Sequence, residues 1–336
     1  MQKNTEIKLF YLKNPKDFGD YVLLDTGEGE KLERFGKYTF VRPHEDAVWL
    51  KTLSKKEWEN ADGKFWSSKV GAKAGWKFNH KIEEKWIMEY KPARHVSQGD
   101  AGEGVKFLAS PTPFRHLGFF PEQASHWDFI EEQIKEWQDV RRQGSPDVGR
   151  LQPLKFLNLF GYTGVASLFA LRAGAEVTHV DASKQILNWA KENQKLNAEL
   201  AESPMRVIED DVLKFLEREE KRGNKYDAVI MDPPKFGRGP KGEVWKIEEM
   251  LPRLLLQVKK VLSDKPLFVI LTSYAIDSSS LSLGYALSEM MKPARPSESG
   301  AGGDFRGNVE MGELCILEQS NKRIIPLANT AVWSAL

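Results

Sequence analysis

Cysteine and clustered histidine, the usual ingredients of crosslinks and zinc sites, are nearly absent from this sequence. Its 336 residues include one cysteine, Cys315, which excludes an internal disulfide. The six histidines are scattered, and none combines with a cysteine at zinc-site spacing. We therefore expect no bound metal. A single cysteine is also typical of a reducing compartment, so we expect a cytoplasmic protein.

Long hydrophobic runs are absent as well. No apolar stretch approaches the roughly 18 residues that a membrane-spanning helix requires, so no membrane partner is expected. Residues 1–10 mix charged and apolar residues and do not resemble a secretory or transit signal.

A basic excess is missing too. The formal net charge is +1, whereas nucleic-acid-binding proteins are often strongly basic. A local basic patch would suffice for RNA, so this absence does not exclude an RNA substrate.

The residues that are present predict two domains. A length of 336 residues, with 41% hydrophobic and 29% charged residues, suits a globular chain of about two domains. Residues 1–110 are predicted to form a β-rich N-terminal domain that could bind substrate or RNA, with strands at 21–24 and 37–41 and a turn at 25–29. Residues 111–336 are predicted to form the second domain.

Tryptophan and lysine are concentrated in residues 49–91 of the first domain. Tryptophans recur about every nine residues there, and residues 51–91 hold ten lysines against six acids. One interpretation is a small β-meander with an aromatic core and solvated lysines. The other is a basic aromatic face on which single-stranded nucleic acid stacks.

Strand and helix patterns alternate in the second domain. A helix is expected at 121–140, where apolar residues keep i, i+3, i+4 spacing, followed by a loop at 141–153. Five β-α units then predict a parallel, doubly wound sheet. Their strands are expected at 155–160, 177–181, 205–208, 226–231 and 267–271, and their helices at 163–173, 183–197, 211–222, 245–262 and 279–291.

The C-terminal segment departs from this alternation. Residues 293–307 are rich in Gly, Pro and Ser and predict a flexible loop. Strands at 313–318 and 323–327 then form a hairpin that adds an antiparallel strand to the sheet. The expected fold class is therefore α/β, with a Rossmann-like, mostly parallel sheet, a C-terminal antiparallel hairpin and a smaller β-rich N-terminal domain.

Ligand-binding residues are expected where the strands end. In an open α/β sheet the ligand lies beyond the carboxyl ends of the strands. The first strand is followed by a loop in which Gly161 and Gly164 would let the backbone approach a ligand. Asp181 ends the second strand, and its carboxylate suits the ribose hydroxyls of a nucleoside. No glycine stands two residues after Gly161, so the loop fits a pyrophosphate poorly.

The third and fourth strand ends carry acids as well. Asp210, Asp211 and Val212 are expected over the adenine, although Asp210 could instead be a helix cap. The fourth strand runs into Asp232, Pro233, Pro234, Lys235 and Phe236. The two prolines fix the backbone, so the Asp232 carboxylate and the Pro233 carbonyl point out of the sheet and can accept hydrogens from a planar amine. Phe236 can stack on a ring.

These motifs resemble the class I S-adenosylmethionine-dependent methyltransferases, whose sheet also ends in an antiparallel hairpin. Residues 232–236 are most similar to the D-P-P-K-F motif of bacterial 23S ribosomal RNA methyltransferases, and the resemblance covers residues 113 to 336. It implies S-adenosylmethionine as cofactor and S-adenosylhomocysteine as product. Residues 118–123 are similar to the segment that covers the methionine end of the cofactor in that family. The implied cofactor-binding residues are Phe120, Gln123, Asn158, Phe160, Gly161, Tyr162, Thr163, Gly164, Asp181, Ala182, Ser183, Asp210, Asp211, Val212 and Asp232.

The sequence departs from cytosine-C5 members of that family. Those enzymes attack the ring with a cysteine, but the fifth strand here ends in Ser273 and Tyr274, and Cys315 on the hairpin is expected to be a small core residue. A nitrogen acceptor needs no covalent adduct. We therefore expect direct in-line methylation of an RNA base nitrogen, with ribosomal RNA as substrate and rRNA processing as the role. Asp232, Pro233, Pro234, Lys235 and Phe236 are the predicted catalytic residues.

Other acceptors stay open at this point. No familiar RNA-binding module precedes the second domain, and the charge is near neutral. These features would also fit a methyltransferase for a protein or a small metabolite. A non-catalytic S-adenosylmethionine-binding protein is a third alternative, which the intact motif at residues 232–236 disfavours.

Overall fold

The computed structural model describes residues 6–13, 17–67, 74–92, 103–144, 152–274, 278–292 and 305–335. Its largest element is an eight-stranded sheet with strand order β1-β16-β17-β15-β12-β9-β10-β11. Only β17 runs antiparallel to its neighbours, so the predicted mostly parallel sheet with a C-terminal hairpin is confirmed. The strands are β1 (Ile7–Phe10), β9 (Lys155–Leu159), β10 (Glu176–Asp181), β11 (Met205–Glu209), β12 (Ala228–Met231), β15 (Phe268–Ser273), β16 (Gly307–Leu317) and β17 (Ile324–Ala335).

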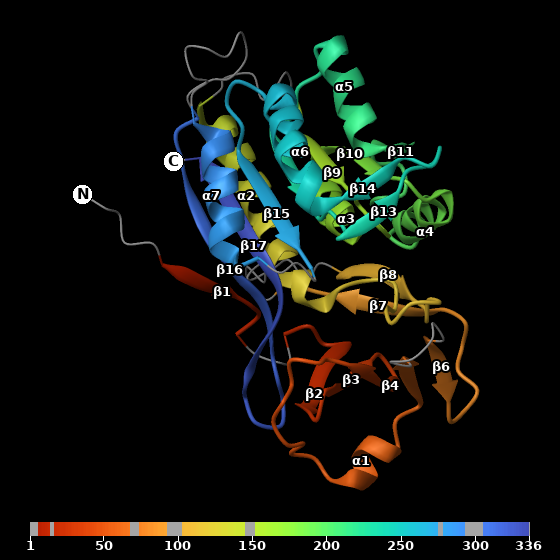
Figure 1. The fold of residues 1–336 in the computed structure, drawn as a ribbon. Coiled ribbons are helices and arrows are strands. Elements are labelled where there is room, and N and C mark those ends of the chain that lie inside the picture. The colour runs from red at the N-terminus through yellow and green to blue at the C-terminus, as the bar shows by residue number, and fades with distance from the viewer. Residues whose placement is uncertain are drawn as a thin grey trace.

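Helices cover both faces of this sheet (Figure 1). Side chains alternate between the faces along a strand, and in β12 both sets are apolar. Ala228 and Ile230 pack with α2 and α3, whereas Val229 and Met231 pack with α5, α6 and α7. The helices are α2 (Ala124–Gly144), α3 (Val165–Arg172), α4 (Lys184–Lys195), α5 (Val212–Arg222), α6 (Ile247–Val261) and α7 (Ser280–Met291). In the part of the chain that is described, no helix is both long and apolar enough to cross a bilayer.

The N-terminal residues form a second, smaller sheet. Its strand order is β2-β3-β4-β5-β6, and β7 and β8 form a separate hairpin. The predicted β-rich character is confirmed, but the prediction missed β3, whose sequence is EKLERF, and the short helix α1. The elements are β2 (Tyr21–Gly27), β3 (Glu30–Phe35), β4 (Tyr38–Pro43), α1 (Lys55–Glu59), β5 (Gly63–Ser67), β6 (Ala74–Phe78), β7 (Trp86–Tyr90) and β8 (Val105–Ala109).

The recurring tryptophans mostly contribute to packing. Trp58 and Trp86 are buried, and Trp49 and Trp76 are half-buried and donate hydrogen bonds to protein oxygens. Trp66 is the exception, at 44% exposed. These positions favour the interpretation of an aromatic core over that of a stacking face for nucleic acid.

Strand β1 and the hairpin β16–β17 link the two parts of the chain. β1, from the N-terminal residues, pairs in parallel with β16 at the edge of the large sheet. The hairpin is much longer than predicted, and its turn reaches the small sheet, where the amides of Gln319 and Ser320 donate to the carbonyls of Leu23 and Leu24. Figure 1 shows the small sheet beyond the carboxyl ends of the parallel strands. The predicted boundary at residue 110 stays a prediction.

Two other predictions need correction. The predicted helix at 245–262 begins later, at Ile247, and it continues through Pro252 without a break. Before it stands an unpredicted short hairpin of β13 (Phe236–Arg238) and β14 (Val244–Lys246). The predicted loop at 141–153 is helical to Gly144, and residues 145–151 lie outside the described residues. Most of the predicted loop at 293–307 lies outside them as well.

Glu318 offers a test of the link between the sheets. Its carboxylate is buried and accepts from the amide and the hydroxyl of Thr26, both at 2.6 Å. Glu318→Ala leaves these donors without a partner, so we expect the free energy of unfolding in urea to fall by about 1–3 kcal/mol. Glu310→Ala, on strand β16, removes an exposed partner of Lys8 and should cost less than about 1 kcal/mol. Equal losses in the two variants would contradict this role of Glu318.

Candidate functional site

A cavity of about 1020 Å³ lies at the carboxyl ends of the parallel strands. Open α/β sheets bind ligands at this edge. Its lining includes residues 110–116, Phe120 and residues that follow β10, β11 and β12. A smaller adjoining cavity of about 60 Å³ continues beneath the loop after β9. Together they bring together these predicted residues: Phe120, Gln123, Asn158, Phe160, Gly161, Tyr162, Thr163, Gly164, Asp181, Ala182, Ser183, Asp210, Asp211, Val212, Asp232, Pro233, Pro234 and Lys235.

The loop after β9 has a left-handed backbone at three positions. The φ angles are 57° at Phe160, 52° at Tyr162 and 84° at Gly164. Residues other than glycine rarely adopt such angles, and they persist only where the surroundings impose them. Here the amide of Gly161 donates to the Val180 carbonyl at 3.0 Å. The amide of Tyr162 donates to the Asp181 carboxylate at 3.1 Å, so the end of β10 holds the loop in place.

Gly161 is required by the protein's own packing. We expected its missing side chain to leave room for a ligand, but a Cβ there would lie 2.3 Å from the ring of His179 and 3.0 Å from Asn158. A Cβ on Gly164 would lie 3.0 Å from the Cβ of Ala190. The two glycines therefore let the loop lie close to β10 and α4.

His179 supports this loop from below. The ring is fully buried, with Nδ1 3.0 Å from the Ser167 hydroxyl and Nε2 3.2 Å from the Tyr162 carbonyl. Asn158 extends this series of hydrogen bonds by donating to the Ser167 hydroxyl at 3.0 Å. Burial lowers the pKa of His179 to about 4, so the ring is neutral near pH 7.

Asp181 presents its carboxylate to the cavity from the end of β10. One oxygen accepts from the Tyr162 amide and the other from the Ser183 amide at 2.9 Å. Each oxygen retains a further lone pair that can accept from a ligand hydroxyl. Burial raises the pKa of this carboxyl, and the backbone hydrogen bonds oppose that rise.

The acids after β11 have separate roles. Asp211, rather than Asp210, is the N-cap of α5, and its side chain accepts from the Lys214 amide at 3.0 Å. Asp210 accepts from the Asp211 amide at 2.9 Å and forms an ion pair with Arg218. Both acids and Val212 line the cavity.

Asp232 lies at the end of β12 and faces the same cavity. The Gln123 side-chain amide donates to it at 3.4 Å and to the Tyr274 hydroxyl at 3.2 Å. Gln123 is oriented in turn by His126, whose Nδ1 lies 2.9 Å from the Gln123 oxygen. Burial, and then the nearby Glu122 carboxylate, raise the pKa of Asp232 well above its ordinary value.

Of the predicted residues after Asp232, some line the large cavity and one does not. Trp245 donates to the Pro234 carbonyl at 2.6 Å, which fastens this loop to β14. Pro233, Pro234 and Lys235 line the large cavity. Phe236 does not line it and is 55% exposed. Its predicted stacking on an acceptor ring therefore stays a prediction.

Two rings beside the predicted Phe120 were not predicted as site residues, namely His116 and Tyr274. The ring of Phe120 lies 5.0 Å from Tyr274, 5.6 Å from Tyr162 and 4.8 Å from His116, measured between centroids. Tyr274 follows β15 at the same edge as Asp232, because β15 pairs with β12. The position of Tyr274, directly after a buried strand, was the sequence signal that could have identified it as a site residue.

The environment of Cys315 does not suit a nucleophile. It is 2% exposed, and burial with the nearby Glu313 raises its thiol pKa to about 12. It does not line the large cavity. The expectation of a small core residue is confirmed. Among the residues that the structure describes, no group of three or more His, Cys, Asp or Glu side chains is placed to hold a metal ion.

Comparison with known proteins gives one match over nearly the whole chain and others over part of it. A crystal structure of a SAM-dependent methyltransferase from Agrobacterium tumefaciens is 38% identical, with a TM-score of 0.80, and the match covers 99% of this chain and 97% of that one. The model of a family described as conserved hypothetical protein 95 matches residues 131–270.

Curated relatives match a shorter part. Ribosomal RNA large subunit methyltransferase I of Aeromonas salmonicida is 42% identical over 134 residues, which is 40% of this chain and 29% of that protein. Ribosomal RNA large subunit methyltransferase K/L of Pseudoalteromonas translucida is 31% identical over 162 residues, or 48% of this chain and 20% of that protein. The chain thus spans less than a third of the length of these two relatives.

The buried His179 predicts an acid-dependent loss of stability. Its folded pKa of about 4 lies below the unfolded value of 6.5, so the unfolded chain binds a proton first as pH falls. The stabilisation is complete above pH 6.5 and is lost between pH 6.5 and pH 4, by roughly 3 kcal/mol. His179→Asn should flatten this part of the pH dependence of unfolding. His80→Asn, at an exposed histidine, should leave it unchanged, and a similar flattening there would contradict the assignment.

Proposed function

The chain belongs to the S-adenosylmethionine-dependent methyltransferases, and from this we propose that it methylates a base nitrogen of RNA, with ribosomal RNA as the substrate. The observation that carries the proposal is the position of Asp232. This half-buried carboxylate follows β12, lines the same cavity as Asp181 and is oriented by Gln123.

The residues around the cavity fit S-adenosylmethionine. The carboxylate of Asp181 suits the ribose hydroxyls, and Asp210 and the Val212 amide suit the adenine. Phe120, Gln123 and residues 160–164 surround the adjoining small cavity, which suits the methionine end. The large cavity, at about 1020 Å³, has room for this cofactor and for part of an acceptor. When bound, the cofactor supplies an activated methyl group on a sulfonium.

Asp232 and its neighbours suit an exocyclic amine or ring nitrogen as acceptor. A carboxylate held by Gln123 can accept a hydrogen from the amine and so orient the nitrogen lone pair toward the methyl group. The raised pKa of Asp232 also brings this carboxyl closer to the range in which it can take up the proton that the nitrogen loses on methylation. Phe120 and Tyr274 would help to exclude water from the reacting atoms.

A nitrogen acceptor also agrees with the cysteine content. A ring carbon would need a thiolate to form a covalent adduct first. Ser273 and Tyr274 end the strand beside Asp232, and Cys315 is buried elsewhere with a raised pKa.

Two observations support RNA as the acceptor. The curated relatives that match residues around the site are named ribosomal RNA large subunit methyltransferases. The small sheet lies beyond the strand ends, where a large substrate would have to approach (Figure 1). A base in a duplex would have to leave its stack to reach Asp232. Ribosomal RNA as substrate would also agree with the cytoplasmic location that the single cysteine favours.

Cofactor binding should depend on Asp181. We expect Asp181→Ala to raise the Kd for S-adenosylhomocysteine roughly 10- to 100-fold, because hydrogen bonds to a charged group are lost. Asp227→Ala is the matched control, since this carboxylate accepts the Lys155 amide at the opposite edge of the sheet. Calorimetric titration should show an unchanged Kd for the control. An unchanged Kd for Asp181→Ala would refute the assignment.

Methyl transfer should require RNA and Asp232. The protein is incubated with methyl-labelled S-adenosylmethionine and unmodified ribosomal RNA, and separately with a protein extract. We expect label in RNA, and Asp232→Asn should lower the rate roughly 100-fold or more, well beyond any change in the Kd for S-adenosylhomocysteine. Label confined to protein would rule out RNA as the acceptor, and an undiminished rate in the variant would rule out the role of Asp232.

A further inference from the structure

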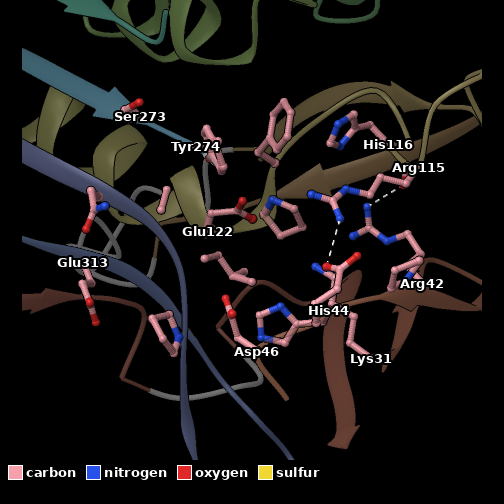
Figure 2. Close-up of a pocket in the computed structure, with 18 of the residues that line it drawn as sticks. Lys31, Arg42, His44, Asp46, Arg115, His116, Glu122, Ser273, Tyr274 and Glu313 are labelled. Atoms are coloured by element: carbon pink, nitrogen blue, oxygen red, sulfur yellow. Dashed lines mark hydrogen bonds and ion pairs between the residues drawn. The ribbon is translucent and has the colours of Figure 1, made fainter. Parts of the chain in front are cut away.

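A second cavity, of about 380 Å³, adjoins the large one. Figure 2 shows Ser273 and Tyr274 from the end of β15 on one side of it, and Lys31, His44 and Asp46 from the small sheet and the loop after it on the other. Glu122 lies between them. The two cavities share four lining residues, which are Arg115, His116, Phe120 and Tyr274. The second cavity therefore adjoins the methyl-transfer site at these four residues.

Two residues that line this cavity each carry a buried polar atom that has no hydrogen-bond partner among the described residues. The atoms are Nε2 of His44, a side chain that is 8% exposed, and Oγ of Ser273, which is 1% exposed. Buried polar groups are nearly always hydrogen-bonded, and leaving one unpaired costs about 1–3 kcal/mol. The residues that carry these atoms come from distant parts of the sequence and line one cavity, which points to a ligand that supplies the missing partners.

The charges around the cavity favour an uncharged ligand over a phosphate. Each cation is already in an ion pair: Arg42 lies 2.6 Å from Glu33, Lys31 lies 3.3 Å from Glu33, and Arg115 lies 3.6 Å from Glu45. Four carboxyl groups also line the cavity, from Glu45, Asp46, Glu122 and Glu313. Phosphate-binding sites present cations and backbone amides without such carboxylates.

A nucleobase matches this lining. Its edges carry hydrogen-bond donors and acceptors side by side, and RNA bases are commonly recognised when they are unstacked and splayed out. The cavity offers donors on Lys31 and Arg42, acceptors on Glu122 and Asp46, and two groups that can do either, His44 and Ser273. Its volume lies within the range of small-molecule sites.

We propose that this cavity binds the base of an RNA nucleotide next to the methylated one. The inference rests on the proposed function, because it assumes an RNA acceptor at Asp232. The hydrogen-bonded set of Asp232, Gln123, Tyr274 and Glu122 runs from the methyl-transfer site to the second cavity. Two neighbouring bases would thus be held on either side of Tyr274.

The test uses Ser273→Ala and His44→Leu in the full-length protein. Because Ser273 Oγ has no partner in the free protein, its removal should not lower the melting temperature and should leave the Kd for S-adenosylhomocysteine unchanged. The KM for unmodified ribosomal RNA should rise roughly 3- to 10-fold in each variant, with kcat changed less than twofold. His44→Gln, which keeps a donor and an acceptor, should recover most of the loss at that position.

Ser263→Ala is the matched control, because Ser263 Oγ is also buried and unpartnered but lies away from both cavities. Its KM should equal that of the unaltered protein. RNA methylation with an unchanged KM in Ser273→Ala and His44→Leu would overturn the base-binding site and leave the proposed function intact. A lack of RNA methylation by the unaltered protein would overturn both.

Discussion

Hydrogen bonds at the tip of the β16–β17 hairpin hold the small sheet against the rest of the protein. Glu318 accepts from Thr26, and Ser320 donates to Asp25, which in turn accepts from Trp58. All of these partners except Ser320 are buried or nearly so. Because Lys31 and His44 reach the second cavity from this sheet, that cavity exists only while the hairpin keeps the sheet in place.

Burial shifts the pKa values of the ionisable groups in and around both cavities. His116 and His179 are neutral because burial lowers the pKa of each, to about 3 and about 4. The carboxyls of Glu122 and Asp232 have raised pKa values for the same reason, and each is hydrogen-bonded through Tyr274 or Gln123. A site of this kind holds polar groups in fixed positions with little excess charge. It thereby suits the recognition of a base and the acceptance of one proton.

The sequence predicts the part of the site that follows from strand order. Asp181 ends the buried strand β10, Asp232 directly follows the buried strand β12, and Asp210 directly follows the edge strand β11, so the sheet topology alone brings them to one edge. It does not predict contacts between distant segments. His44 and Ser273 line one cavity although no local pattern relates them. The reason for Gly161 also stayed hidden, because His179, which fills the space, lies on another strand.

Strand β3 was not predicted for a similar reason, because its contacts are with distant residues. Its sequence, EKLERF, reads as solvent-exposed, yet Lys31 and Glu33 are buried, because Glu33 pairs both with Lys31 and with Arg42 on β4. Charged residues inside a strand can be recognised only when their partners are known. The hairpin β13–β14 was missed because its strands have three residues each and stand among glycines and prolines.

In the proposed reaction, Asp232 directs the methyl group to a base nitrogen without a covalent adduct. The most direct test is mass spectrometry of nucleosides from RNA that the protein has methylated with labelled S-adenosylmethionine. We expect to find the label in a nucleoside that is methylated on a base nitrogen. Label in a 5-methylpyrimidine or in a 2′-O-methylribose would contradict this proposal.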